Sequence, residues 1–255
     1  MIATAFGTLT GVPLQGEREW ATETDDTAVR YLKACKFDIE KAHSMLTKSL
    51  QWRREFRPTE IKPEDIESES ETGKAFWSGH DRQGRAIWNV DASKAKTTAP
   101  EKYLKLMAYN LEKGALLNPE GVTQLSVVAD VGSTSMWNQN PVSVTLQLVN
   151  MLQNHYPEKL GMALCVNPSS FMWILWTMLS GFVDPNTKAK IFFTSSSPDA
   201  NTKKRGKNEE GTAGWVSNID DLIELDQLCS KSGGTYPYEY NHAEYWAEIK
   251  KRLWE

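Results

Sequence analysis

Apolar side chains recur along this chain with two different spacings, which predict helices first and then alternating strands and helices. Near the start the spacing is three or four positions, which predicts a short helix over 25–32 and a longer one over 38–56. Pro58 and Pro63 break this pattern, and 61–73 is predicted to be an acidic connection. The first part of the chain is therefore predicted to be a small helical unit.

Beyond this unit, short apolar runs alternate with helical patterns. Residues 81–84 have the composition of a tight turn, and a strand is predicted after it over 86–90. The following elements are predicted to be helix 100–117, strand 124–130, helix 141–155, strand 162–166, helix 169–182 and strand 190–194. After them come a polar loop 195–215, a helix 220–228, a turn at Gly233 and Gly234, and a helix 242–254. Strands separated by such helices indicate right-handed crossovers and a mainly parallel sheet.

These patterns place the chain in the α/β class, with a small all-helical N-terminal module followed by a mainly parallel sheet flanked by helices. We divide it into an N-terminal arm 1–24, a helical module 25–70, a sheet domain 71–240 and a C-terminal helix 241–255. The first sixteen residues are rich in Gly, Thr and Ala without periodicity, and we assign them no function.

The helix predicted over 169–182 is apolar on every side. Asn167 and Pro168 have the composition of a helix start. Its apolar residues are Phe171, Met172, Trp173, Ile174, Leu175, Trp176, Met178, Leu179, Phe182 and Val183. The helix is shorter than the roughly 20 residues needed to cross a bilayer. Three interpretations remain: a buried core helix, a helix lining an apolar cavity, and a helix that touches lipid with its outer face.

Composition narrows the classes of function. A net charge of −4 argues against a nucleic-acid binder, which would carry a basic surface. Three cysteines without a CxxC pair suit a reducing compartment, and the N-terminus lacks the pattern of a secretory signal, so we expect a soluble cytoplasmic protein. The common hydrolase, dinucleotide, P-loop and zincin motifs are missing, and the four histidines lack ligand spacing. We expect no enzyme, no cofactor and no metal.

Polar residues collect at both ends of the apolar helix. Glu158 precedes it, and Thr187 and Lys190 follow it. A cavity with apolar walls and a few charges at its rim suits a lipid. The plain alternative for Glu158 and Lys190 is a surface ion pair. Lys203, Lys204, Arg205 and Lys207 in the polar loop would either touch anionic lipid or remain solvated.

Several ordered stretches resemble the CRAL-TRIO family of lipid-transfer proteins. The matching stretches are RYLKACKFDIEKAHSMLTKSLQWRREF, DRQGRAIW, VVADVGS, LQNHYPEKLGMALCVNP and FVDPNTKAKIFF, with Gly233 and Gly234 resembling the closing turn. The resemblance implies a parallel sheet that forms the floor of a lipid pocket and a mobile gate helix over 169–182. The gate and cavity residues would be Phe171, Met172, Trp173, Leu175, Trp176, Met178, Leu179 and Phe182.

The branch of this family that carries phosphatidylinositol holds the headgroup with a basic pair after the first helix, the Glu of YPE, and the Thr and Lys of DPxTxxK. The matching residues are Lys36, Glu158, Thr187 and Lys190, whereas Cys35 replaces the family's Arg. Because Cys cannot reproduce the bidentate guanidinium fork, we expect weakened inositol-lipid binding. Candidate contacts to a second lipid are Ser133 and Ser135.

The resemblance implies a lipid-transfer or lipid-presenting protein that holds phosphatidylinositol, exchanging it with phosphatidylcholine or another lipid. Its expected partners are phospholipid, a transiently bound membrane surface that makes it peripherally membrane-associated, and a lipid kinase or other signalling protein. One alternative is a carrier of a less polar lipophile such as a retinoid, tocopherol or sterol-like molecule, which Cys35 permits. The other is a lipid-holding signalling or scaffold module without transfer activity, which binds a protein through 195–215 or the tail.

Overall fold

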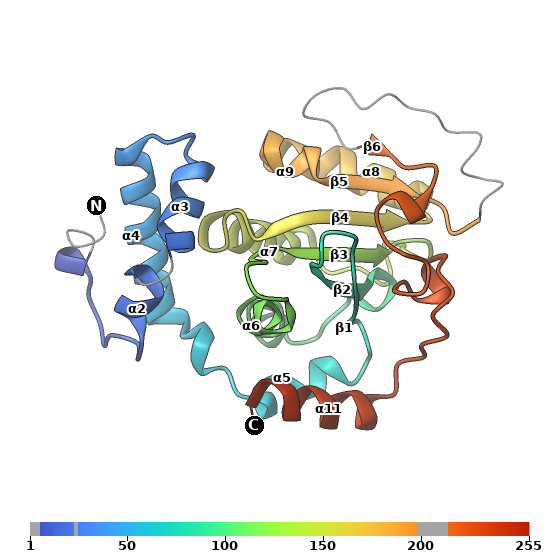
Figure 1. Cartoon of the computed structure of the whole chain (residues 1–255), viewed down its shortest axis with the longest axis horizontal. Coiled ribbons are helices and arrows are strands. Elements are labelled where there is room, and N and C mark those ends of the chain that lie inside the picture. The colour runs from blue at the N-terminus through green and yellow to red at the C-terminus, as the bar shows by residue number, and fades with distance from the viewer. Residues whose placement is uncertain (1–5, 23–24, 198–213, 255) are drawn as a thin grey trace.

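A helical module lies at one end of a six-stranded sheet in this computed structural model, which describes residues 6–22, 25–197 and 214–254 (Figure 1). The basic cluster 203–207 lies outside the described residues. The helices of the module are α2 (Glu17–Thr22), α3 (Asp25–Ala34) and α4 (Ile39–Phe56). The helices predicted over 25–32 and 38–56 are therefore confirmed.

The module has a core of its own around Tyr31, Leu46 and Leu50, which are fully buried. Phe6 and Leu9 pack against this core, so part of the segment assigned to an arm is held by apolar contact. The Asp38 carboxylate caps α4 by accepting from the amide of Lys41 at 3.1 Å. These contacts make the module a packed unit.

The stretch predicted to be an acidic connection contains a helix, α5 (Pro63–Ser70), and that prediction is wrong. Pro63 occupies the first helical position, where a missing N–H costs nothing. Ile66 is fully buried against the main core. One apolar side chain in a short acidic segment is too weak a signal for sequence periodicity, and tertiary packing decides the helix.

The sheet has the strand order β1-β2-β3-β4-β5-β6. The strands are β1 (Ala75–His80), β2 (Ala86–Asp91), β3 (Leu125–Asp130), β4 (Leu160–Val166), β5 (Ile191–Thr194) and β6 (Gly214–Trp215). β1 and β2 form the predicted antiparallel hairpin, and all later neighbours are parallel. The α/β class with a mainly parallel sheet is thus confirmed.

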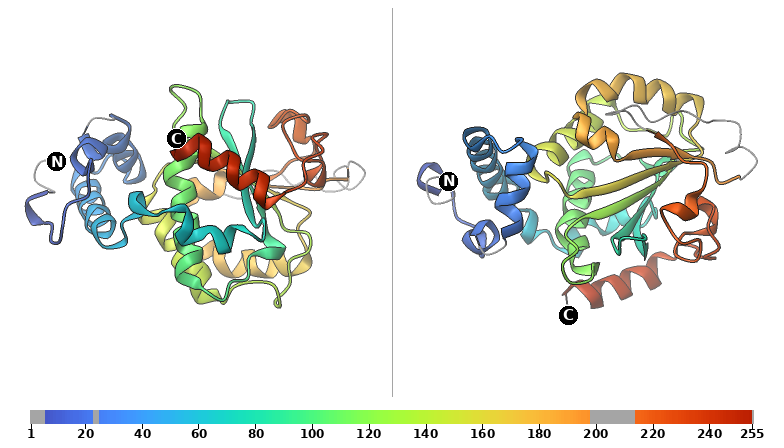
Figure 2. Two further views of the ribbon diagram at one scale, coloured as in Figure 1. Left: turned by 90° about the horizontal axis from the view of Figure 1, so that it is seen from below. Right: turned by 45° about the horizontal axis from the view of Figure 1, so that its top comes forward.

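Because consecutive parallel strands are neighbours, right-handed crossovers place the connecting helices on one face of the sheet. These helices are α6 (Pro100–Gly114), α7 (Val142–His155), α8 (Ser170–Leu179) and α9 (Pro185–Ala189). α8 and the C-terminal α11 (His242–Trp254) lie at opposite edges of the sheet (Figure 2). The main core lies between this face, α6, α7 and α11.

The opposite face of the sheet is covered by residues 219–228. The helix predicted over 220–228 is absent from this segment, so that prediction is wrong. The segment contains only a 3-10 turn, Ile219–Asp221, followed by irregular backbone. Ile219, Ile223 and Leu228 are buried against β3 and β4, so their spacing imitates a helical face. The backbone instead bonds to other parts of the chain: the Leu222 carbonyl accepts from Arg82, and the Leu228 carbonyl accepts from Tyr236.

Candidate lipid-binding site

An apolar cavity of about 280 Å³ lies between the sheet, α6, α7, α9 and the helical module. Its apolar walls include Trp88, Leu111, Leu125, Val127, Leu152 and Leu160. The module contributes Ala34 from α3 and Met45 from α4. The cavity is therefore shared between the two parts of the fold.

Three of the four predicted headgroup residues meet at the rim of this cavity. Lys190 Nζ lies 2.8 Å from Glu158 Oε2, with side chains 23% and 21% exposed. Thr187 also lines the cavity, and its hydroxyl donates to Asp184. Lys36 does not line the cavity and is exposed on the turn after α3. The Glu158–Lys190 pair is thus a half-buried pair beside an apolar space, unlike a fully solvated surface pair.

The short helix α9 holds Thr187 and Lys190. Asp184 is its N-cap, and its Oδ1 accepts from the amides of Asn186 at 2.8 Å and Thr187 at 3.1 Å. Pro185 supplies the first helical position, and Lys190 ends the helix. The sequence analysis missed α9, although an Asp followed by Pro is a helix-start signal. The DPNTKAK stretch therefore builds its own scaffold for the two polar groups.

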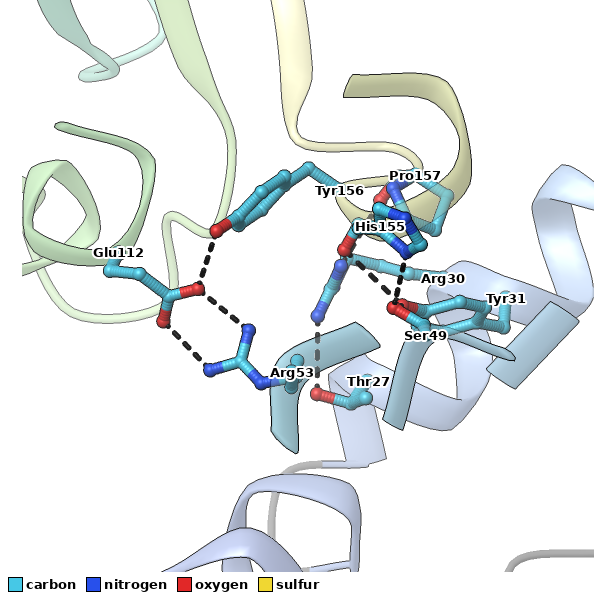
Figure 3. A network of polar contacts seen from close by, with 9 residues as sticks. All are labelled: Thr27, Arg30, Tyr31, Ser49, Arg53, Glu112, His155, Tyr156 and Pro157. Carbon is cyan, nitrogen blue, oxygen red and sulfur yellow. Dashed lines mark hydrogen bonds and ion pairs between the residues drawn. The ribbon is translucent and has the colours of Figure 1, made fainter. Parts of the chain in front are cut away.

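Glu158 lies in a left-handed backbone conformation, with φ 58°. The turn that carries it is held from two sides. Arg30 Nη1 donates to the Pro157 carbonyl at 3.1 Å (Figure 3). Gln124 Nε2 donates to the Glu158 carbonyl at 3.1 Å. A non-glycine residue in this conformation costs free energy, and it persists because its surroundings determine it. The carboxylate is held toward Lys190.

The module supports this turn through a polar and aromatic network (Figure 3). The Tyr31 hydroxyl lies 2.6 Å from Ser49 Oγ and donates to the His155 carbonyl at 3.2 Å. Trp52 stacks on the His155 ring with centroids 4.2 Å apart. These contacts hold the end of α7 and, through it, the residues that precede Glu158.

A buried ion pair completes the network. Arg53 donates to both oxygens of Glu112, at 2.6 and 3.0 Å, and the Tyr156 hydroxyl donates to Glu112 at 2.8 Å (Figure 3). Burial, followed by the Glu112 charge, raises the pKa of Tyr156 well above its ordinary value, so the phenol remains a donor. The sequence analysis did not identify these three residues as a group because they lie on α4, on α6 and after α7.

His155 predicts a pH dependence of stability. Burial, followed by the Arg53 charge, lowers the pKa of His155 from 6.5 to about 4. The unfolded chain therefore takes up a proton that the folded chain refuses, and stability is expected to fall as the pH drops from 6.5 towards 4. His155→Phe keeps an aromatic ring against Trp52 and should flatten this decline. Urea unfolding at about pH 7 and about pH 5 measures it, and equal pH slopes in the two proteins would contradict the assignment.

Trp88 is a pocket residue that the sequence analysis missed. Its side chain lines the cavity, it is only 5% exposed, and its indole nitrogen has no hydrogen-bond partner among the described residues. An indole nitrogen can only donate, and a buried donor without an acceptor is costly. A ligand oxygen would satisfy this group. No local pattern in the sequence distinguishes it from a core tryptophan.

Helix α8 lies at the surface, so the interpretation as a fully buried core helix is wrong. Ile174, Met178 and Phe182 are 64%, 47% and 59% exposed and form a stripe with a spacing of four residues. On its inner side the ring of Trp173 lies 4.6 Å from that of Phe193, and Leu179 is buried. None of the eight predicted gate residues lines the described cavity, which lies toward the module. The stripe leaves an apolar surface open to contact.

The start of α8 differs from the prediction. Ser169 is the N-cap, with its Oγ accepting from the Met172 amide at 3.1 Å, whereas Asn167 accepts from the Ser196 amide at 2.8 Å. The prediction failed because Asn167, with φ 57°, bonds across to the segment after β5. Ser169 Oγ also lies 2.7 Å from Thr134 Oγ1. In the sequence, Thr134 stands between Ser133 and Ser135, the two predicted contacts to a second lipid.

Those two contacts, Ser133 and Ser135, lie in the loop after β3 and do not line the cavity. The Ser133 carbonyl accepts from Asn138 Nδ2, and the Ser135 amide donates to Asn138 Oδ1.

Within the described residues, no helix is long and apolar enough to span a membrane. The same residues contain no group of three or more side chains arranged to hold a metal ion.

The chain matches two family models in the order expected from its motifs. The CRAL/TRIO N-terminal domain matches residues 9–48, and the CRAL/TRIO domain matches residues 70–210. The chain therefore belongs to the CRAL/TRIO domain family, and the resemblance inferred from its motifs is confirmed. The crystal structure of Sfh5 has the same fold, with a TM-score of 0.57, 17% identity and coverage of 90% of this chain and 82% of that chain.

Several curated proteins are similar in sequence. A CRAL-TRIO domain-containing protein of Schizosaccharomyces pombe is 30% identical over 91% of this chain and 21% of its own length. The phosphatidylinositol transfer protein PDR17 of Saccharomyces cerevisiae is 26% identical over 93% of this chain and 64% of its own length. The phosphatidylinositol/phosphatidylcholine transfer protein SFH12 of Arabidopsis thaliana is 29% identical over 64% of this chain and 34% of its own length. The chain thus spans less than two thirds of each of these relatives.

Proposed function

We propose that this protein holds one phospholipid in the cavity beside α7 and transfers or presents it, with phosphatidylinositol exchanging for phosphatidylcholine or another lipid. The observation that carries the proposal is the Glu158–Lys190 pair, joined by Thr187 at the rim of an apolar cavity. Two relatives named as phosphatidylinositol transfer proteins support the choice of cargo. Catalysis plays no part in the proposal.

The rim groups match the chemistry of an inositol phospholipid. The Lys190 ammonium would donate to the phosphate, and the Thr187 hydroxyl would do so after turning away from Asp184. Glu158 would accept from inositol hydroxyls. The pair orients both side chains before the lipid arrives, which lowers the entropy lost on binding. Inside the cavity, acyl chains would lie against Leu111, Val127 and Leu152, and a lipid ester oxygen would accept from the Trp88 indole.

The cavity has to extend beyond its described walls to hold a whole diacyl lipid. A volume of about 280 Å³ is at the low end even for pockets that hold small ligands, and a diacyl lipid needs more room. In our proposal α8 moves outward when the lipid enters and presents Ile174, Met178 and Phe182 to a membrane. These side chains are already exposed, so their contact with lipid requires no unfolding of the core.

Replacing Lys190 tests the headgroup assignment. Lys190→Ala removes a charged donor, so phosphatidylinositol transfer between vesicles should fall on the order of tenfold to a hundredfold, with phosphatidylcholine transfer preserved. Lys188→Ala is the matched control, because Lys188 lies on the same helix and does not line the cavity. An equal loss for both lipids, or no loss for either, would contradict the assignment.

A carrier of a less polar lipophile is the second candidate, and Cys35 favours it. The thiol lies 3.8 Å from the sulfur of Met45, which lines the cavity, and burial, followed by the Asp38 charge, raises the pKa of Cys35. A neutral thiol at this position offers a phosphate no positive charge and only one weak hydrogen-bond donor, whereas a guanidinium offers a charge and several donors. Mass spectrometry of the purified protein under native conditions separates the two candidates by the mass of the lipid that accompanies it.

A further inference from the structure

The turn between α3 and α4 has a backbone that its residues do not favour. Lys36 and Phe37 have φ values of 52° and 63°. The Phe37 amide donates to the Leu32 carbonyl at 2.7 Å and the Lys36 amide donates to the Lys33 carbonyl at 3.0 Å, which is the bonding pattern of a Schellman helix end. The position of Lys36 in this motif is ordinarily occupied by Gly, because Gly carries no Cβ penalty there. The chain keeps a lysine at a strained position.

The side chains of this turn face solvent. In a Schellman motif the residue at the position of Phe37 commonly packs back on the helix, yet Phe37 is 67% exposed. Ile39, two residues later, is 61% exposed. Two large apolar side chains at a turn tip gain free energy only from contact with something outside this chain.

The charges around the tip favour a phosphate-rich surface. Lys33 and Lys36 are exposed, and neither forms an ion pair with any residue that the structure describes. The Asp38 carboxylate accepts from the Lys41 amide and forms an ion pair with Lys41 Nζ at 2.9 Å. Among residues 33–41, Glu40 is therefore the one acidic residue outside a described ion pair. Apolar side chains flanked by lysines are favourable at the interface of a bilayer. There the apolar side chains enter the headgroup layer, and the ammonium groups bind lipid phosphates.

The tip lies on the side of the molecule where lipid would be exchanged. In Figure 1 the α3–α4 turn, α9 and α8 all lie along the upper side. The cavity is bounded by Ala34 and Met45 from the elements flanking the turn and by Thr187 from α9. In the same view of Figure 1, α9, the helix of Thr187, lies between the α3–α4 turn and α8.

We propose that residues 33–39 form a docking tip for an anionic bilayer, with Phe37 and Ile39 inserted among the headgroups and Lys33 and Lys36 bound to lipid phosphates. This inference rests on the proposed function in one respect: the proposed function places the cavity rim and α8 on the side that faces the membrane. It gives Lys36 a partner in the bilayer surface in place of the headgroup of the bound lipid. With α8 as the other contact, the tip orients the cavity rim toward the membrane.

Vesicle sedimentation with the full chain tests the tip. Phe37→Ser with Ile39→Ser should weaken binding to phosphatidylcholine–phosphatidylserine vesicles on the order of a hundredfold, because both side chains lose apolar contact. Leu116→Ser is the matched control, because Leu116 is 64% exposed on the 3-10 turn after α6. This variant should bind the vesicles as the unaltered protein does. Equal binding by the tip variant and the control would overturn the proposal.

Lys36→Gly separates a docking role from a structural one. Glycine suits the left-handed backbone, so the urea midpoint should not fall, while binding to the anionic vesicles weakens about fivefold. Binding to vesicles of phosphatidylcholine alone should change little. Arg57→Gly is the control, since it removes a positive charge from another left-handed helix end, after α4. Unchanged binding of Lys36→Gly to the anionic vesicles would contradict the proposal.

Lipid content measured without vesicles distinguishes this inference from the proposed function. Native mass spectrometry should find the same bound lipid in the tip variants and the unaltered protein. If the unaltered protein carries no lipid but the tip variants still lose vesicle binding, the docking tip stands and the proposed function fails. If lipid is bound and transferred while the unaltered protein and the tip variants sediment alike, the docking tip is overturned and the proposed function stands.

Discussion

Arg53→Met is expected to lower the free energy of unfolding by about 3–5 kcal/mol. The Arg53 side chain is only 2% exposed and that of Glu112 is 12% exposed, so removing the guanidinium leaves a carboxylate buried without its counter-charge. The guanidinium also lies 4.1 Å from the Trp20 ring centroid, a contact that methionine replaces only in part. Urea unfolding at neutral pH measures the loss.

The double variant Arg53→Met with Glu112→Leu is the control for this prediction. Replacing both members of a buried pair by apolar groups of similar size is often close to neutral. The double variant should therefore regain most of the lost stability, apart from the acceptor that Tyr156 loses. A double variant as unstable as Arg53→Met would show that the loss arises from packing and not from the unpaired charge.

Ala34→Trp is expected to abolish lipid loading while the protein stays folded. Ala34 lies on the last turn of α3 and lines the cavity, so an indole there would occupy the space assigned to the lipid. Bound lipid and vesicle transfer should both fall on the order of tenfold or more, since a filled cavity has no room for an acyl chain. Native mass spectrometry and a transfer assay with phosphatidylinositol measure the two effects.

Two variants make this prediction specific. Ala34→Ser changes the size of the residue little and should retain the lipid. Ala189→Trp places the same indole at an exposed position of α9 that does not line the cavity, and it should also retain the lipid. If Ala34→Trp carries as much lipid as Ala189→Trp does, the cavity beside α7 is not where the lipid binds.

Local patterns in the amino-acid sequence were enough to predict the order and type of most of the principal elements. The spacing of Ala42, Met45 and Leu46 predicts α4, and the turn at 81–84 predicts the hairpin of β1 and β2. The crossover helices between short apolar strands were sufficient to infer parallel pairing. All these features depend on contacts between residues a few positions apart, or on one face of a single element, and such contacts leave a periodic pattern in the chain.

How these elements meet depends on contacts between parts of the chain that are far apart in sequence. α5 and the irregular segment over 219–228 follow from where Ile66 and Ile223 are buried, and the apolar α8 turns a stripe outward because the sheet covers only one of its sides. The Glu158–Lys190 pair lies at the cavity rim, while Lys36 lies away from it on a strained turn. Arg53, Glu112 and Tyr156 meet across the module boundary. Such contacts join residues far apart in sequence, so no local pattern records them, and packing and charge pairing in three dimensions determine them.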